Sequence, residues 1–273
     1  MTVGIIRTGN STSIGVVTTK TLISPSSGLF MPSDAKALLA VKPVLASALR
    51  TTVESTSVRL DIESADIKGM SPFEVLFAPV GAGLGITFST FSGKSPEYRI
   101  NAALGGGDSV NVYGTALVNN STTAPEAMAY IVVSNDARDL QGQIQKHAKL
   151  GTMTTAGVTT DTDVAGTKYS FSGGRRITEL IGLFHPVVIA ANDALVGGIK
   201  YTSSEFVDSI PQELPLFPFM FGLGATGSVL IPGVSRQRVN IPVKSGQVNI
   251  QDYLNCGLLP ASAGKFIDGV IYE

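Results

Sequence analysis

Hydrophobic and polar residues alternate with a period of two along most of this chain. Between Val53 and Ile62, the apolar side chains of Val58 and Leu60 are separated by polar ones, which is the pattern of a half-buried β-strand. Clusters of Gly, Pro, Ser and Asn separate such runs at short spacing, as in a β-sandwich or barrel. The other predicted strands are 73–80, 110–118, 129–133, 186–190, 198–206, 216–221, 238–243, 248–253 and 266–272.

One segment near the middle of the chain departs from this alternation. Ser134-Asn135-Asp136 supplies residues that commonly cap the N-terminus of a helix, and Ala137 to Leu150 is rich in helix formers. Gly151 follows at a position where a helix commonly ends. The pattern therefore predicts one short helix, followed by a Thr-, Gly- and Asp-rich linker from Thr152 to Thr167.

The second half of the chain repeats the first at a distance of about 139 residues. Arg99-Ile100-Asn101 and the segment around Leu60 both recur 139 residues later, as Arg238-Val239-Asn240 and around Ile199. Four further matches keep the same order along the chain, so the shared register predicts a duplication. These matches are 110–112 with 248–250, 76–77 with 216–217, 130–133 with 269–272, and 38–44 with 180–187.

A repeat of this length is too long for a solenoid and leaves room for about eight strands per copy, the size of one jelly roll. The sequence thus predicts an all-β fold of two tandem eight-stranded jelly-roll sandwiches, with one short helix near the midpoint. The predicted boundaries are 1–134 for the first jelly roll with an N-terminal arm, 135–167 for the helix and linker, and 168–273 for the second jelly roll. The arm at 1–28 has no clear counterpart, and we expect it to order only on assembly.

The composition narrows the possible functions. Only 15% of the residues are charged, against about 25% in an average globular protein, and this suits a surface that copies of the same chain cover. The 20 basic and 21 acidic residues form no strong basic cluster, which argues against nucleic-acid binding as the main task. The one cysteine excludes an internal disulfide, and no signal peptide or membrane-spanning segment is evident, so we expect synthesis in the cytoplasm.

Three candidate motifs for ligand or metal binding are rejected, because the residues around them do not fit the function. The segment 222–227 fits the G-x-G-x-x-G pattern of dinucleotide-binding proteins, but a β-branched stretch broken by Pro232 follows instead of a helix. The segment 93–95 resembles the end of a phosphate-binding loop, but Phe88 stands where that loop needs glycine. His147 and His185 are isolated, so they cannot form the multi-histidine metal site of a cupin enzyme.

The acidic residues and the cysteine are also interpreted as structural. Asp66 and Glu205 occupy equivalent places in the two copies, and we interpret them as one turn position present twice. The segment 161–163 has alternating acids but lacks the glycine and glutamate of a calcium loop. Cys256 is expected to be a buried, small hydrophobic residue. We therefore assign no catalytic, cofactor-binding or metal-binding residues.

Two tandem eight-stranded units, low charge and no catalytic constellation together resemble the double jelly-roll major capsid proteins. These build the shells of tailless icosahedral viruses with an internal membrane, including bacterial and archaeal ones. The resemblance rests on the repeat of Arg99 to Val133 in Arg238 to Tyr272, and on the paired strands near Leu60 and Ile199. It covers most of the chain, and no short invariant motif anchors it.

The resemblance implies a non-enzymatic virion protein, made in the host cytoplasm, that forms pseudo-hexagonal homotrimers and assembles into an icosahedral capsid. Its partners would be other copies of itself in the trimer and in neighbouring capsomers, vertex (penton) proteins and an internal membrane. It implies no cofactor, no small-molecule substrate and no specific nucleic-acid binding. Two alternatives stay open: a duplicated carbohydrate-binding or adhesion module, and a tail-tube or ring-forming subunit.

Overall fold

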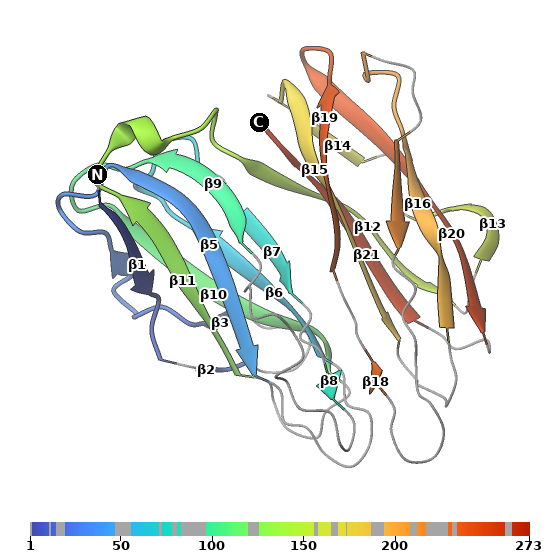
Figure 1. Ribbon diagram of the computed structural model, residues 1–273, viewed down its shortest axis with the longest axis horizontal. Helices are drawn as coiled ribbons and strands as arrows, with labels where there is room; N and C mark the ends of the chain where they lie inside the picture. The colour runs from blue at the N-terminus through green and yellow to red at the C-terminus, as the bar shows by residue number, and fades with distance from the viewer. Residues whose placement is uncertain are drawn as a thin grey trace. The chain divides into compact units, whose positions relative to one another are not determined.

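The chain forms antiparallel β-sheets in a computed structural model (Figure 1). The structure describes residues 2–10, 12–14, 20–46, 56–70, 73–77, 81–82, 97–119, 126–155, 158–164, 169–172, 174–186, 194–207, 212–216, 229–230, 234–259 and 264–273. Within these ranges the fold is all-β, as predicted. One 3₁₀ turn, η2 (Ala137–Asp139), is the only helical element among them.

The described strands follow one another in two series. The first series is β1 (Val3–Arg7), β2 (Thr12–Ser13), β3 (Thr21–Leu22), β4 (Leu29–Phe30), β5 (Ala37–Ala46), β6 (Thr56–Glu63), β7 (Phe73–Phe77), β8 (Gly81–Ala82), β9 (Tyr98–Ala103), β10 (Ser109–Asn119) and β11 (Glu126–Ser134). The second is β12 (Lys146–Thr155), β13 (Val158–Asp163), β14 (Tyr169–Ser172), β15 (Arg176–Pro186), β16 (Ala194–Thr202), β17 (Gln212–Leu216), β18 (Val229–Leu230), β19 (Val234–Pro242), β20 (Gln247–Leu259) and β21 (Gly264–Tyr272).

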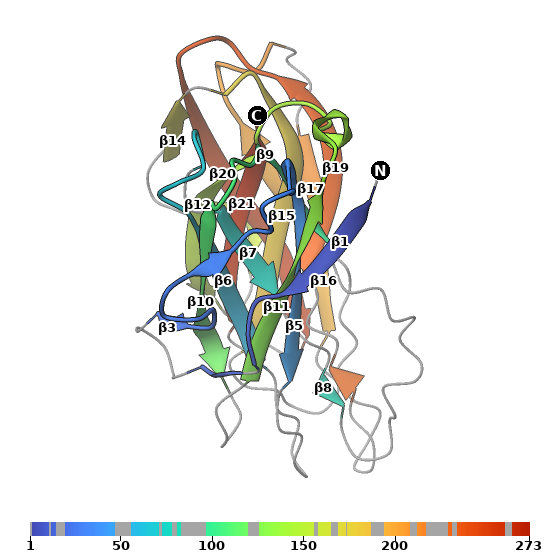
Figure 2. The same cartoon turned by 90° about the vertical axis from the view of Figure 1, so that its left-hand side faces the viewer.

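The strands form two compact units with the same sheet topology (Figures 1 and 2). In unit 1, the strand orders are β1-β11-β5-β9 and β3-β10-β6-β7. In unit 2, they are β12-β21-β15-β19 and β13-β20-β16-β17. The short strands β4 and β14 also match, because each pairs with the central strand β10 or β20. A short ladder between β8 and β18 adds to unit 2.

Both units contain the same irregularity in their third long strand. Leu39 is the extra residue of a bulge between β5 and β11, and Thr178 is the extra residue between β15 and β21, 139 residues further along. The pairing of these strands with β9 and β19 shifts at the same points. Since a bulge inserts one residue at one site in a ladder, its recurrence shows that the units share their detailed backbone course.

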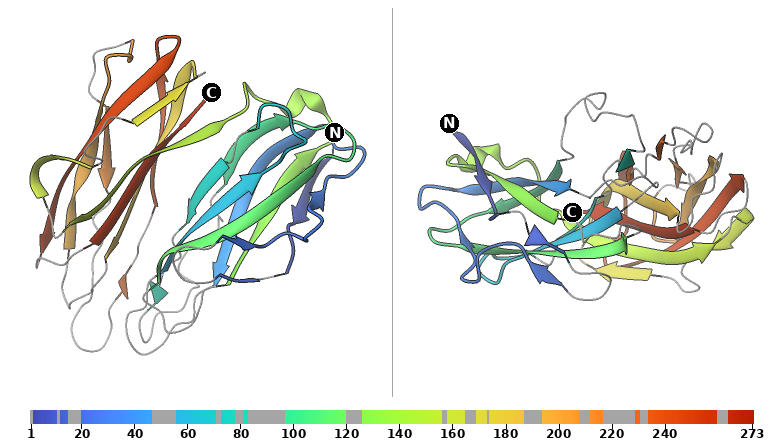
Figure 3. Two further views of the ribbon diagram at one scale, coloured as in Figure 1. Left: turned by 180° about the vertical axis from the view of Figure 1, so that it is seen from behind. Right: turned by 90° about the horizontal axis from the view of Figure 1, so that it is seen from below.

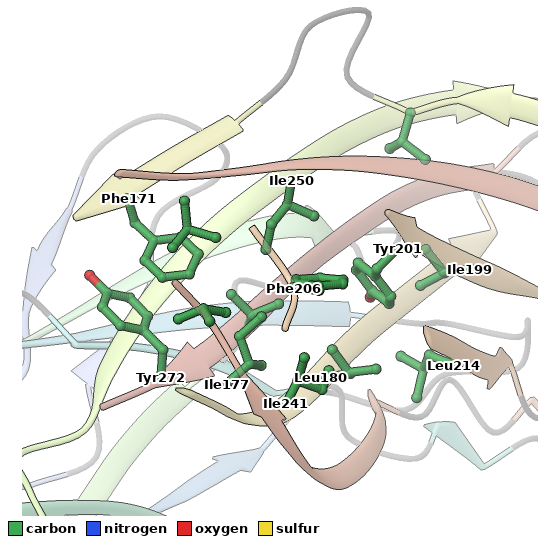
Figure 4. Packing of buried hydrophobic residues seen from close by; sticks show 14 of the residues in the cluster. Phe171, Ile177, Leu180, Ile199, Tyr201, Phe206, Leu214, Ile241, Ile250 and Tyr272 are labelled. Atoms are coloured by element: carbon green, nitrogen blue, oxygen red, sulfur yellow. The ribbon is translucent and has the colours of Figure 1, made fainter. Parts of the chain in front are cut away.

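The core of unit 2 lies between its two sheets (Figure 4). Leu180 and Val270 come from one sheet, and Ile199 and Ile250 from the other, and all four are fully buried. Burying an aliphatic side chain of this size contributes about 1.5–3 kcal/mol relative to exposure. The two-residue spacing of such side chains in β16 and β20 is the physical origin of the alternating sequence pattern.

The predicted helix over Ala137 to Leu150 is wrong. After the turn η2, Gly142 has a φ of 88°, which a helix does not accommodate, and the Asn101 side-chain amide donates to the carbonyl of Gln141 at 2.6 Å. The chain then enters β12, which pairs with the central strand β21. Sheet pairing therefore overrides the local helix propensity, and residues 146–155 and 158–163 form strands rather than a helix and linker.

The N-terminal segment is also integrated into its own unit. Residues Val3 to Arg7 pair with β11 along their whole length. Figure 1 labels β1 beside β11, and the left panel of Figure 3 draws the same ribbon from behind. Strand β1 takes the same place in unit 1 that β12 takes in unit 2. The arm thus has a counterpart in the repeat, in the segment that the sequence assigned to the helix and linker. Residues Val3 to Arg7 thus pair within their own chain, and the expectation that the arm orders only on assembly stays a prediction.

The ladders refine the register of the repeat. Leu60 pairs with Val75 and Ile199 with Leu214, which confirms the match of Leu60 with Ile199 at 139 residues. The match of segment 110–112 with 248–250 is wrong by two residues. Ile62 pairs with Val112, and Tyr201, the residue of unit 2 equivalent to Ile62, pairs with Asp252. Val112 is therefore equivalent to Asp252 and not to Ile250. A slip of two preserves an alternating pattern, so the sequence did not reveal it.

The placement of β1 predicts unequal effects at two adjacent isoleucines. Ile6 lies opposite the fully buried Ile131, whereas Ile5 is 60% exposed on the other face of the strand. We expect Ile6→Ala to lower the free energy of unfolding by about 1–2 kcal/mol, and Ile5→Ala by less than about 0.5 kcal/mol. Urea unfolding followed by circular dichroism measures both. Equal, small effects would show that β1 does not contribute to the isolated subunit.

Candidate functional site

The equivalent acids Asp66 and Glu205 each close a turn. The Asp66 carboxylate accepts hydrogen bonds from the Ser109 hydroxyl at 2.6 Å and the Ser109 N–H at 3.0 Å. The Glu205 carboxylate accepts from the Ser204 hydroxyl at 2.6 Å and the Asn249 N–H at 3.1 Å. These hydrogen bonds lower the pKa of Asp66 and bring the pKa of Glu205 to about 2. Both carboxylates are thereby held ionised in structural roles, in agreement with the predicted turn position.

The remaining predicted candidates do not come together as a site. His147 lies on β12 beside Gly269, and the ladders place Ile181, rather than His185, in the position equivalent to Lys42. Segments 93–95 and 222–227 lie outside the described residues, as does the side chain of Cys256. Within the described ranges, no group of three or more His, Cys, Asp or Glu side chains is arranged to hold a metal ion.

The sheets β3-β10-β6-β7 and β13-β20-β16-β17 each carry an ion pair on their outer face, with the acid and the base exchanged between the two strands. In unit 1, the ammonium of Lys20 lies 3.3 Å from the Asp61 carboxylate, which also lies 3.2 Å from Nε of Arg59. In unit 2, the acid comes from the neighbouring strand instead, and Asp161 lies 3.1 Å from Lys200. The Asp61 side chain is 2% exposed, against 45% for Asp161. The units thus share a backbone but present different charge patterns.

A hollow of about 270 Å³ accompanies this change in unit 2. Gly198 occupies the position equivalent to Arg59, so no side chain covers the backbone there. Tyr253, Asn255 and Glu213 line the hollow together with the ion pair just described. An aromatic side chain beside amide, carboxylate and ammonium groups can hydrogen-bond and stack on a polar ligand.

Apolar side chains are exposed on the outer face of another sheet, the one that contains β1. Val3 is 50% exposed and Ile5 60%, and Val44 on β5 is 37% exposed. Met128 of the central strand β11 lies directly opposite Val44 and joins it on this face. We call these four residues, Val3, Ile5, Val44 and Met128, the β1 patch; the row of Arg7, Tyr130 and Lys42 lies between its two halves.

A pair of aspartates is buried inside unit 2. Asp252 on β20 and Asp268 on β21 each have 0% exposure, and they come from opposite sheets. Both side chains point into the core. Asp252 lies between the buried residues Ile250 and Leu254 on β20, and Asp268 lies between Phe266 and Val270 on β21. Within the described part of the chain, no side-chain N–H or O–H group donates to either carboxyl. The backbone N–H of Gly151 is directed at Asp268 and partly offsets the rise of its pKa, and the other side-chain partner of each carboxyl is the opposite carboxyl.

Burial governs the protonation of this pair. Loss of solvation raises the pKa of the Asp268 carboxyl well above its ordinary range, and the charge of Asp252 raises it further. Loss of solvation also raises the pKa of Asp252. A hydrogen bond between the two requires one shared proton, and because burial raises the pKa of both carboxyls, the pair retains that proton as a unit.

Gly151 provides the space for the two carboxyls. A Cβ atom there would lie 2.6 Å from Oδ2 of Asp252 and 2.7 Å from Oδ1 of Asp268, closer than real atoms approach. The third neighbour is Val164, whose Cγ1 would lie 2.6 Å from the same Cβ. Any side chain at position 151 would therefore displace the aspartate pair.

Unit 1 has apolar residues at the positions equivalent to the two aspartates, and its polar groups there come from other residues. The register places Val112 where unit 2 has Asp252, and Ala129 where it has Asp268. There the buried hydroxyl of Thr8 accepts a hydrogen bond from the Ala129 N–H at 3.1 Å, and the Ser24 hydroxyl accepts from the Val112 N–H at 3.2 Å. The polar atoms thus come from residues that follow the outer strands β1 and β3 in unit 1, and from the central strands in unit 2.

Sequence reasoning missed the aspartate pair, although a signal was present. Both residues occupy the apolar phase of an alternating strand, in the runs Val248-Asn249-Ile250-Gln251-Asp252 and Phe266-Ile267-Asp268-Gly269-Val270. An acid in the inward phase is rarely buried without a partner. That two such acids meet across the sandwich is visible only in the folded chain.

Comparison with known proteins adds no family assignment. No model of a protein family matches this chain, and no curated protein matches it. Among the described residues, no helix combines the length and the apolar character needed to cross a bilayer.

The two ion pairs predict unequal stability effects. Asp61→Ala removes a buried carboxylate that Lys20 and Arg59 share, but Lys20 retains Glu63 and Arg59 retains Glu74, so we expect a loss of about 1–2 kcal/mol. Asp161→Ala removes an exposed partner of Lys200, and we expect a loss below about 1 kcal/mol. Urea unfolding at low and moderate salt compares them. A larger loss for Asp161→Ala would contradict the assigned burial.

Proposed function

We propose that this chain is a self-associating structural subunit, the major capsid protein of a virus of the double jelly-roll type. In this proposal both units are jelly rolls, and three chains form a trimer of pseudo-hexagonal outline. The trimer would pack with its neighbours, with vertex proteins and over an internal membrane. The chain would then be a virion component, made in the host cytoplasm, without enzymatic activity.

The strand order carries this proposal. Numbering the eight main strands of either unit along the chain gives sheets of order 1-8-3-6 and 2-7-4-5. A jelly roll is an eight-stranded, two-sheet fold of this Greek-key kind. Two such units in one chain give a trimer six similar blocks, and six blocks suit a hexagonal lattice. Fold alone does not establish function, so the proposal also draws on the surface.

The surface supports assembly in two ways. A chain with 15% charged residues requires little desolvation of ions when copies pack together. The β1 patch offers apolar side chains on an otherwise solvated sheet face, and such patches commonly mark contact surfaces. The two units differ in their surface charges, which allows each to make its own contacts within a shared outline.

The carbohydrate-binding alternative has one observation in its favour. The hollow over Gly198, with Tyr253, Asn255 and the Asp161–Lys200 pair, offers the mixed stacking and hydrogen-bonding groups that a sugar requires. The absence of tryptophan from the sequence weighs against it.

The oligomeric state distinguishes these proposals. We expect light scattering of the purified chain to give a mass three times 28.4 kDa, and negative-stain images to show hexagonal outlines or closed shells. A monomer over a wide concentration range would overturn the capsid proposal. Binding of glycans by such a monomer, lost in Tyr253→Ala, would establish the alternative.

The β1 patch gives a second prediction for the assembled protein. We expect the double substitution Val3→Ser/Ile5→Ser to raise the concentration at which trimers or shells dissociate by at least tenfold, because both side chains are exposed in the isolated chain. Val207→Ser is the control, since Val207 is 56% exposed but lies in unit 2. Sedimentation velocity over a dilution series measures both. Equal dissociation of the two variants would exclude the patch as a contact.

A further inference from the structure

We propose that the facing carboxyls of Asp252 and Asp268 make the fold of unit 2 depend on a retained proton. Unit 2 is then most stable in mildly acidic solution and loosens as the pH rises, whereas unit 1 lacks this response. The inference concerns the folding of one unit and stands independently of the proposed capsid function.

The geometry requires the proton. Asp252 and Asp268 have 0% exposure, both carboxyls lie against Gly151, and no side-chain donor or cation among the described residues reaches them; the one backbone donor, the N–H of Gly151, does not cancel a charge. Two ionised carboxylates at this position would repel each other where water does not screen them. One proton removes a charge and supplies the missing hydrogen bond, so the singly protonated pair is the form that the interior tolerates.

The surroundings do not offer a neutralising cation. Asp163 on β13 is an acid, and its charge adds to the burial that raises the pKa of Asp252. Tyr201 on β16 is fully buried, and burial followed by the charges of the two aspartates raises its pKa well above the ordinary range, so it remains neutral. His147 on β12 lies against Gly269, which faces away from the pair because successive residues of β21 point to opposite faces. Lys200 on β16 is likewise directed to the outer face, toward Asp161.

Unit 1 serves as an internal comparison. At the positions of the two aspartates it has Val112 and Ala129, and its nearby polar groups are the hydroxyls of Thr8 and Ser24, which do not titrate. The two units share strand order and the bulge, so the backbone itself does not require the acids. A proton dependence present in one unit and absent from the other follows from these substitutions alone.

The direction of the effect follows from linkage. A carboxyl whose pKa is raised in the folded state keeps its proton while the unfolded chain, with a pKa near 3.9, releases it. The contribution of this pair to stability is therefore complete below about pH 4 and decreases as the pH rises toward the raised pKa. For each proton retained only by the folded unit, the unfolding equilibrium constant increases about tenfold per pH unit.

The test is urea unfolding of the full chain between pH 4.5 and 7.5, followed by circular dichroism, with limited proteolysis and mass spectrometry to show which unit opens. We compare the wild type with Asp268→Asn, whose amide donates to Asp252 at every pH. In the wild type, we expect the unfolding constant of unit 2 to rise at least tenfold per pH unit over part of this range. In Asp268→Asn, we expect that rise to be smaller by about tenfold per pH unit.

Two further variants keep the proposal falsifiable. Asp161→Asn removes an exposed acid from the same unit and should retain the wild-type pH dependence. If Asp268→Asn does not fold, Asp252→Val/Asp268→Ala introduces the residues of unit 1 and should make unit 2 independent of pH in this range. Equal pH dependence in the wild type and in the variants that lack the acids, or opening of unit 1 first on raising the pH, would overturn the proposal.

Discussion

Each unit is closed by the insertion of its last strand between its first and its third. Strand β11 lies between β1 and β5, and β21 lies between β12 and β15. More than 100 residues separate β1 from β11 along the chain, so this pairing has a large loop-closure cost that local contacts cannot offset. The sheet therefore becomes complete only when both ends of the unit meet, and the core of the sandwich is covered at the same step. The first strand of each unit is for this reason part of the fold rather than an appendage.

On the central strands that this pairing creates, burial of a polar side chain has its largest desolvation free energy. A strand with partners on both edges and a sheet across the core is shielded from water on every inward position. Asp252 and Asp268 occupy such positions on β20 and β21. Unit 1 avoids this cost because its hydroxyls come from Thr8 and Ser24, which follow the outer strands β1 and β3 and accept hydrogen bonds from backbone N–H groups. The same backbone thus accommodates either hydroxyl groups or carboxyl groups in its interior, and only the carboxyl groups change their protonation with pH.

The surfaces of the two units diverged further than their backbones. The reversal of the Lys20–Asp61 pair into Asp161–Lys200 preserves a favourable interaction but alters the pattern of charge that a neighbour would meet. The replacement of Arg59 by Gly198 exposes a hollow in unit 2 alone. In a shell of the proposed kind, a shared backbone keeps the outlines of the blocks alike while differing surfaces make their contacts unequal.

The sequence by itself determined the all-β class and the existence of the repeat, because alternation records which side of each strand faces a core. It matched Leu60 of the first copy with Ile199 of the second correctly, since the flanking residues there are distinctive. It misplaced the match at Val110 by two residues, because a period of two is unchanged by such a slip. It also predicted a helix at 137–150, where local propensity favours one and pairing with β21 prevails. Only the tertiary structure decided that β1 and β12 are equivalent and that Asp252 faces Asp268, since both depend on contacts between strands that the chain brings together on closing each sandwich.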